Sequence, residues 1–113
     1  MKHETKKISK IVDEILTYFL FHFNARAEIT ITPEPERYRM QFRFSDVPIT
    51  DEAYAALDQR LVVKRQPELE DYYWQLTGEI EDSNELMLVA MMCDSIEMRR
   101  DGNDITLNLV RSI

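Results

Sequence analysis

Few residues in this sequence have the types and spacing that chemistry requires. Glu14 lies in an amphipathic segment and is a candidate general base, because a carboxylate can take a proton from water or a hydroxyl. Tyr18 and His22 follow at four and eight positions, a spacing that puts all three on one side of a helix. No second His or Cys is spaced to share a metal with His22, so we expect it to be a hydrogen-bonded core histidine.

Three further polar positions have simple interpretations. Asp46, just before Val47 and Pro48, is most simply an exposed turn carboxylate, and the alternative is contact with the amino group of a purine. Residues 101–104 resemble a calcium loop only superficially, because no glutamate follows at the required distance. The single cysteine, Cys93, is expected to be a small buried hydrophobic residue rather than a reactive thiol. No metal site is predicted.

Composition limits the classes of protein and partner. The chain has 113 residues, the length of one domain, and its 14 basic and 21 acidic residues give a net charge of −7. This charge repels nucleic acid and anionic lipid and favours basic partners. One cysteine excludes a disulfide framework, the charged start is unlike a signal peptide, and the longest apolar run, 15–23, is too short to span a bilayer. We therefore expect a cytoplasmic protein.

Apolar periodicity predicts the elements that position these residues. Helical spacing indicates a long first helix over residues 6–24, and alternation indicates a strand over 27–32 that ends because Pro33 cannot donate a ladder hydrogen bond. A second alternating strand spans 37–44, with its arginines outward beside Glu28. Thr50 begins a helix, Pro67 begins another that ends near Gly78, and Asp82 with Glu85 can cap a third.

The last third of the chain is predicted to be a helix followed by a β-hairpin. Leu86, Val89, Ala90 and Cys93 line one side of the helix. Two alternating strands follow, around residues 96–98 and 105–109, and 101–103 form the turn between them. The order of helix, two strands, two or three helices and two strands predicts a single α+β domain, a two-layer sandwich with a mostly antiparallel sheet and helices on one face.

The residues in this order resemble the ATPase superfamily shared by gyrase B, histidine kinases, MutL and the anti-sigma-factor serine kinases (GHKL, or Bergerat fold), and the anti-sigma kinases most of all. The family's first motif helix carries a Glu that activates water and, four positions on, an Asn that binds Mg²⁺. In this chain Glu14 matches the Glu and Tyr18 stands at the Asn position. Asp46 falls where the family places its adenine-binding Asp, but no Gly follows it. Residues 86–107 are similar to the family's closing segment.

The departures from the family pattern predict an eroded ATP site. A Mg²⁺–phosphate site needs a hard oxygen ligand and glycine backbone close to the phosphates, and the chain has only two glycines, Gly78 and Gly102. A tyrosine phenol is a poor magnesium ligand, and residues 82–85 place carboxylates where the family has its glycine-rich box. We expect no ATP and no Mg²⁺, with Glu14 a vestigial base and Asp46 a vestigial adenine contact.

Two apolar groups suggest a surface for a protein partner. Tyr72, Tyr73 and Trp74 are consecutive, so at least one must face away from the core, and they lie where the family carries its mobile lid. Met87 and Met91 lie one turn apart and off the main apolar stripe of their helix. Together these five residues are the predicted partner surface.

The resemblance and its departures lead to one main hypothesis. The chain is interpreted as a non-catalytic, regulatory protein-binding domain of bacterial type. It would bind a sigma factor or another regulator, or form a homodimer, and bind neither nucleic acid nor membrane. The alternatives are an active ATP-binding serine kinase or anti-sigma factor, and a small-ligand domain with a pocket lined by Tyr18, Phe42 and residues 72–74.

Overall fold

The described part of the chain forms eight elements. The computed structural model describes residues 3–62, 65–69 and 82–113. In chain order the elements are α1 (Glu4–Phe23), β1 (Arg26–Glu34), β2 (Arg37–Ser45), α2 (Asp51–Leu61), the 3₁₀ turn η1 (Pro67–Leu69), α4 (Asp82–Met91), β3 (Ser95–Asp101) and β4 (Asp104–Ser112). The described elements follow the order predicted from the sequence. Of the helix predicted over residues 67–78, only residues 67–69 are described, and they form a 3₁₀ turn; the rest of that prediction lies outside the described residues.

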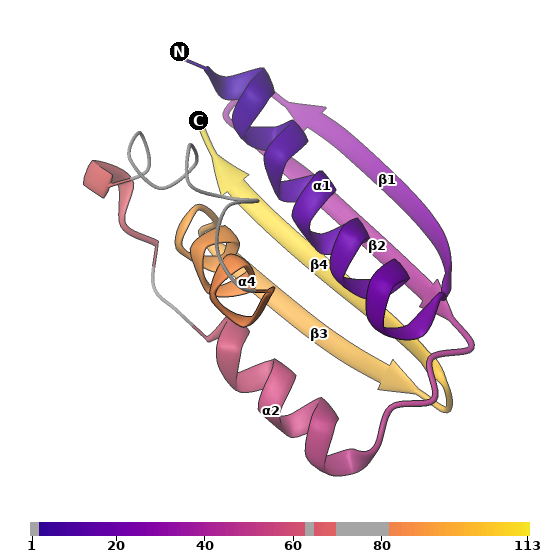
Figure 1. Ribbon diagram of the computed structural model, residues 1–113. Helices are drawn as coiled ribbons and strands as arrows, with labels where there is room; N and C mark the ends of the chain where they lie inside the picture. The colour runs from indigo at the N-terminus through magenta and orange to yellow at the C-terminus, as the bar shows by residue number, and fades with distance from the viewer. Residues whose placement is uncertain (1–2, 63–64, 70–81) are drawn as a thin grey trace.

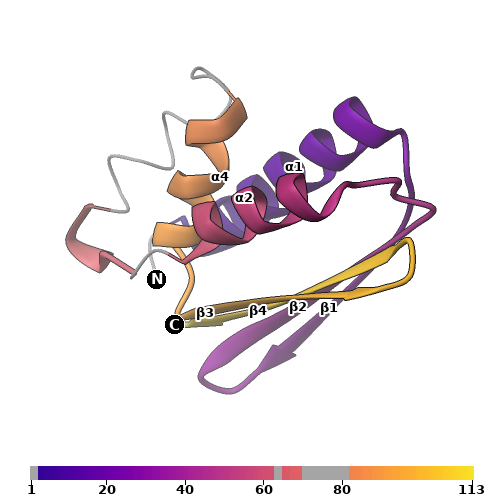
Figure 2. The same ribbon diagram turned by 90° about the horizontal axis from the view of Figure 1, so that it is seen from below.

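The four strands form one antiparallel sheet in the order β1-β2-β4-β3. Helices α1, α2 and α4 all lie over the same face of this sheet (Figures 1 and 2). The α+β class, the antiparallel sheet and the placement of the helices on one face are therefore confirmed. Among the described residues, no helix combines the length and the apolar content that crossing a membrane requires.

Alternation along the central strands builds the core. Met40, Phe42 and Phe44 of β2 point toward the helices and are buried, while the alternating polar residues point to the opposite, open face: Arg37, Arg39, Gln41 and Arg43. The same alternation in β4 buries Ile105, Leu107 and Leu109. From α1, the ring of Phe19 stacks on that of Phe44 with 4.1 Å between centroids, which fixes the helix over the sheet.

Both β-hairpins close through two-residue turns. Gly102 and Asn103 join β3 to β4, and Gly102 has a φ of 62°, a conformation that glycine adopts without strain. The first hairpin turns at Pro35 and Glu36, so β1 continues to Glu34 and does not end at residue 32 as predicted. Pro33 is tolerated because β1 is an edge strand, where a missing N–H can point away from the sheet.

Helix α2 begins as the sequence predicts and covers the outer side of β3. The Thr50 hydroxyl accepts a hydrogen bond from the Ala53 N–H at 3.1 Å and caps the helix. Leu57 and Leu61 are buried, and the Tyr54 hydroxyl donates to the Met98 carbonyl at 3.2 Å. The side of α2 that faces the sheet therefore packs on the core and also bonds to the outer edge of β3.

Two side chains of α1 are more exposed than expected, and Cys93 lies in a different place along the chain's elements. His22 is exposed instead of buried: it lies on the apolar stripe of α1, but in the last turn of the helix. Leu20, which belongs to the apolar run of residues 15–23, is 42% exposed. Cys93 is buried as expected, but it lies two residues beyond the end of α4 rather than within the helix.

Candidate functional site

The candidate base, Glu14, lies in the middle of α1 on the side that faces the core. Its exposed fraction is 4%, and Ile11 and Ile15 beside it are also buried. A general base must come within hydrogen-bonding distance of the proton it removes. At this exposure, a substrate dissolved in the surrounding water has no access to the Glu14 carboxylate.

Tyr18 occupies the next turn of α1 and belongs to an aromatic cluster. Its ring is half-buried and meets the Phe19 ring edge-on at 5.4 Å and the His22 ring at 4.3 Å between centroids. Position 18 therefore contributes to packing along α1. Among the described residues, no group of three or more His, Cys, Asp or Glu is placed to hold a metal ion.

Asp46 has a structural role at the end of β2. Its φ of 60° is left-handed, a conformation in which Asp is several-fold enriched, and its N–H donates to the Asp104 carboxylate at 3.2 Å. The next residue, Val47, donates its N–H to the Asn103 carbonyl at 2.6 Å. These two bonds attach the end of β2 to the β3–β4 turn, and the Asp46 side chain is exposed.

The predicted partner surface is seen only in part. Met87 is 40% exposed and Met91 is half-buried, which places both at the boundary of the core. Their neighbours Leu86, Val89 and Ala90 are buried as expected. Tyr72, Tyr73 and Trp74 lie outside the described residues, so their prediction stands untested.

Sequence reasoning missed the most exposed aromatic residue of α1. Phe21 is 76% exposed and Leu20 beside it is 42% exposed. The signal was present, because Phe19, Leu20 and Phe21 are consecutive and a helix cannot turn three consecutive residues to one core. Phe19 alone is buried, which leaves the other two as an apolar patch on the outer side of the helix.

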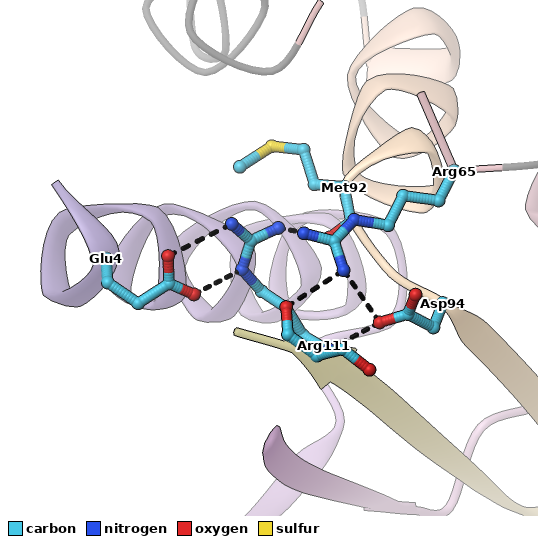
Figure 3. A network of polar contacts seen from close by, with 6 residues as sticks. Glu4, Arg65, Met92, Asp94 and Arg111 are labelled. Atoms are coloured by element: carbon cyan, nitrogen blue, oxygen red, sulfur yellow. Dashed lines mark hydrogen bonds and ion pairs between the residues drawn. The ribbon is translucent and has the colours of Figure 1, made fainter. Parts of the chain in front are cut away.

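Figure 3 shows a polar network that joins the start of α1 to the ends of α4 and β4. The Arg111 guanidinium donates to both carboxylate oxygens of Glu4, at 2.7 and 3.2 Å, and to the Met92 carbonyl. Beside it, Arg65 donates to Asp94 at 2.7 Å and to the Ser112 carbonyl at 2.9 Å. Arg111 follows the inward alternation of β4, so the pattern that buries Leu109 buries this charge too.

Two described ionisable groups, Asp94 in this network and Tyr54 on α2, have shifted pKa values. Partial burial raises the pKa of Asp94, but the Ser112 N–H and the Arg65 guanidinium lower it by more than burial raises it. The net pKa of Asp94 therefore lies below its ordinary value of 3.8. The pKa of Tyr54 is raised above 10.0, first by burial and then by the Asp58 charge, against the opposing effect of Arg100. Both shifts stabilise the form that makes the hydrogen bonds: ionised Asp94 and neutral Tyr54.

The open face of the sheet carries the predicted arginine row. Arg37 and Arg39 both pair with Glu34, at 3.2 and 3.1 Å, and Arg43 stands opposite Glu28 in the strand register. A shallow depression of about 240 Å³ lies between these strands, floored by Gln41 and Asn108, which hydrogen-bond to each other. This is the solvated, ion-paired sheet face expected from the alternation.

Comparison with known proteins adds no assignment to this geometry. No protein-family model matches the sequence. No curated protein is significantly similar to it.

Proposed function

We propose that this protein is a non-catalytic regulatory domain that binds another protein. It is built on the scaffold of the GHKL ATPases, nearest to the anti-sigma-factor kinases, and its nucleotide site has been lost. The partner is a sigma factor or another regulator with a basic surface, because a net charge of −7 attracts basic groups and repels nucleic acid.

The observation that carries the proposal is the state of the α1 face where catalysis would require access. Glu14 is 4% exposed and Tyr18, one turn on, is packed between two neighbouring rings. A magnesium–triphosphate complex needs open space and oxygen ligands at these positions. This helix face instead offers a buried carboxylate and an aromatic cluster.

The glycines support the same conclusion. Gly102 is used by the β3–β4 turn at a φ of 62° and is therefore committed to the hairpin. That leaves Gly78 as the single other glycine in the sequence. A phosphate cradle requires several backbone amides that approach closely, and glycine permits this approach because it has no Cβ.

The protein-binding part of the proposal is supported by the exposed apolar residues of α1. Phe21 and Leu20 form a patch on the side of the helix away from the sheet, where neither contributes to the core. Aromatic residues in such positions are enriched at protein interfaces. Phe21 is therefore the residue whose replacement should weaken partner binding most.

The experiment has a nucleotide arm and a partner arm. Thermal unfolding and calorimetry with Mg-ATP and Mg-ADP should show no stabilisation, whereas a dissociation constant below about 100 µM would raise stability by more than about 1 kcal/mol at millimolar nucleotide. In the second arm, tagged wild-type protein and Phe21→Ser are compared with Val62→Ser, a matched control at a 77% exposed residue of another element.

We expect one or more proteins to be retained by the wild type and by Val62→Ser and lost with Phe21→Ser. Nucleotide binding with saturable stabilisation would contradict the loss of the site and favour the active-kinase alternative. Equal retention by all three variants would contradict the role of the α1 patch.

A further inference from the structure

The two edge strands of the sheet differ in whether other elements hydrogen-bond to their outer sides. The order β1-β2-β4-β3 makes β1 and β3 the edge strands. At β3, the Tyr54 hydroxyl donates a hydrogen bond to the outward-facing Met98 carbonyl. The Arg100 side chain donates to the Asp51 carboxylate and to the Ile49 carbonyl. In the described part of the chain no hydrogen bond from another element reaches the outer edge of β1. An uncovered edge strand is a template for pairing with another strand.

The hairpin turn determines which groups of β1 point outward. Because Pro35 and Glu36 form a two-residue turn, Glu34 and Arg37 are a hydrogen-bonded pair, and such pairs alternate along an antiparallel ladder. The even-numbered residues of β1 therefore bond to β2, and the odd-numbered ones direct their peptide groups outward. These are Ala27, Ile29, Ile31 and Pro33. Pro33 fits this pattern, since its missing N–H falls on the outer side.

We propose that the partner at this edge is a second copy of the same chain, paired antiparallel through β1 with a two-fold axis at Thr30. The sequence of β1 is complementary to itself in that register: Ile29 stands opposite Ile31 of the other copy, and Arg26 stands opposite Glu34. Each relation occurs twice, once on either side of the axis. The result is one sheet that continues from copy to copy. This inference does not depend on the proposed function.

Charge selects this register over its neighbours. With the axis at Glu28, the two copies of Glu28 stand opposite each other. With the axis at Ile31, Glu28 of one copy stands opposite Glu34 of the other. Like charges directly opposite each other destabilise a strand pair, and opposite charges stabilise it. An axis at Ile29 leaves Glu34 without an opposite strand residue. The axis at Thr30 alone pairs all nine residues of β1 and both charged ends.

Exposure is consistent with an interface at this edge. Ile31 points to the helix side of the sheet, as its register partner Met40 does, yet it is 42% exposed while Met40 is 1% exposed. In the proposed pair, Ile29 of the second copy covers Ile31. The Arg26 side chain is 79% exposed, and its ion pair with Glu28 is long, at 3.8 Å, so the guanidinium can turn to Glu34 of the second copy.

Disulfide trapping tests both the pairing and the register. With the axis at Thr30, the two Thr30→Cys side chains face each other across a non-hydrogen-bonded pair, where Cβ atoms lie about 4.5–5.5 Å apart, close enough to form a disulfide after a small adjustment. Thr32→Cys is the matched control: the two copies of residue 32 are offset by four residues, or roughly 13 Å. The native thiol, Cys93, is buried and shared by both variants.

With copper–phenanthroline and oxygen as oxidant, Thr30→Cys should give a disulfide-linked dimer on a non-reducing gel and Thr32→Cys should remain monomeric. Equal cross-linking of the two variants, or none in either, would overturn the register.

Analytical ultracentrifugation over a dilution series from millimolar to micromolar tests the dimer without any cysteine. Ile31→Lys should raise the dimer dissociation constant by roughly a hundredfold, because the two-fold axis repeats a loss of about tenfold per site. Val62→Lys, the same change at an exposed residue outside β1, should dimerise as the wild type does. Circular dichroism establishes that both variants are folded. A wild-type monomer at millimolar concentration, or an unchanged Ile31→Lys dimer, would refute the proposal.

Discussion

Arg111 carries the most deeply buried charge among the described residues, with 1% of its surface exposed. Its guanidinium is satisfied by the two oxygens of Glu4 and by the Met92 carbonyl. Such a pair adds little stability relative to an apolar pair of the same volume, but removing one partner strands the other charge in the interior. The cost of mutation should therefore depend on which partner is removed.

Glu4→Ala is expected to lower the free energy of unfolding by roughly 3 kcal/mol, because Arg111 remains buried without its counter-charge. Arg111→Met should cost less, since Glu4, at 11% side-chain exposure, lies nearer to solvent than Arg111 does and methionine fills the vacated space. Urea unfolding of the two variants and of the double variant measures both effects. Equal losses in the two single variants would show that packing, not the stranded charge, dominates.

The pH dependence of stability should include a contribution from Asp94. Its folded pKa lies below the unfolded value of 3.8, so its stabilising effect is fully present above that pH and is lost as the pH falls through the folded pKa. The difference in unfolding free energy between wild type and Asp94→Asn should therefore be constant near neutral pH and shrink below about pH 4. Urea titrations at a series of pH values measure it. A difference that does not change on acidification would contradict this assignment.

At the scale of elements, α2 depends on the cap at its start. Thr50→Ala removes the acceptor for the Ala53 N–H and is expected to lower stability by about 1 kcal/mol. Thr17→Ala is the control, because its hydroxyl bonds to Asp13 inside α1 and alanine is the better helix former. Thermal unfolding compares the two variants. A loss in Thr17→Ala as large as that in Thr50→Ala would argue against capping as the cause.

Strand β1 shows why element boundaries were harder to predict than the elements themselves. Alternation predicts the strand correctly, but it places the strand's end before Pro33, because a proline cannot donate to a ladder. Whether a proline ends a strand depends on the side to which its missing N–H would point: toward the neighbouring strand or away from the sheet. This is set by the turn and by the position of β1 at the edge, neither of which the local pattern contains.

At the scale of the whole molecule, the sequence predicted the fold better than the site. Periodicity placed the core side chains of β2 and β4, since burial on one face is a local property of a strand. The contact between Arg111 and Glu4 joins residues 107 positions apart, and no local pattern reports such a pair. The prediction for His22 fails for a related reason: helical spacing puts it on the apolar stripe of α1, but how far the core extends along the last turn depends on the other elements.

The position of β4 has a consequence for the biosynthesis of the chain. This strand lies between β2 and β3, although it comes after both of them in the sequence. As the protein leaves the ribosome, the first hairpin emerges early, and the flank of β2 that β4 will occupy stays vacant until residues 104–112 have cleared the exit tunnel. Long-range pairing of this kind folds slowly and leaves apolar strands uncovered meanwhile. Translation speed and chaperone supply should therefore influence the yield of native protein.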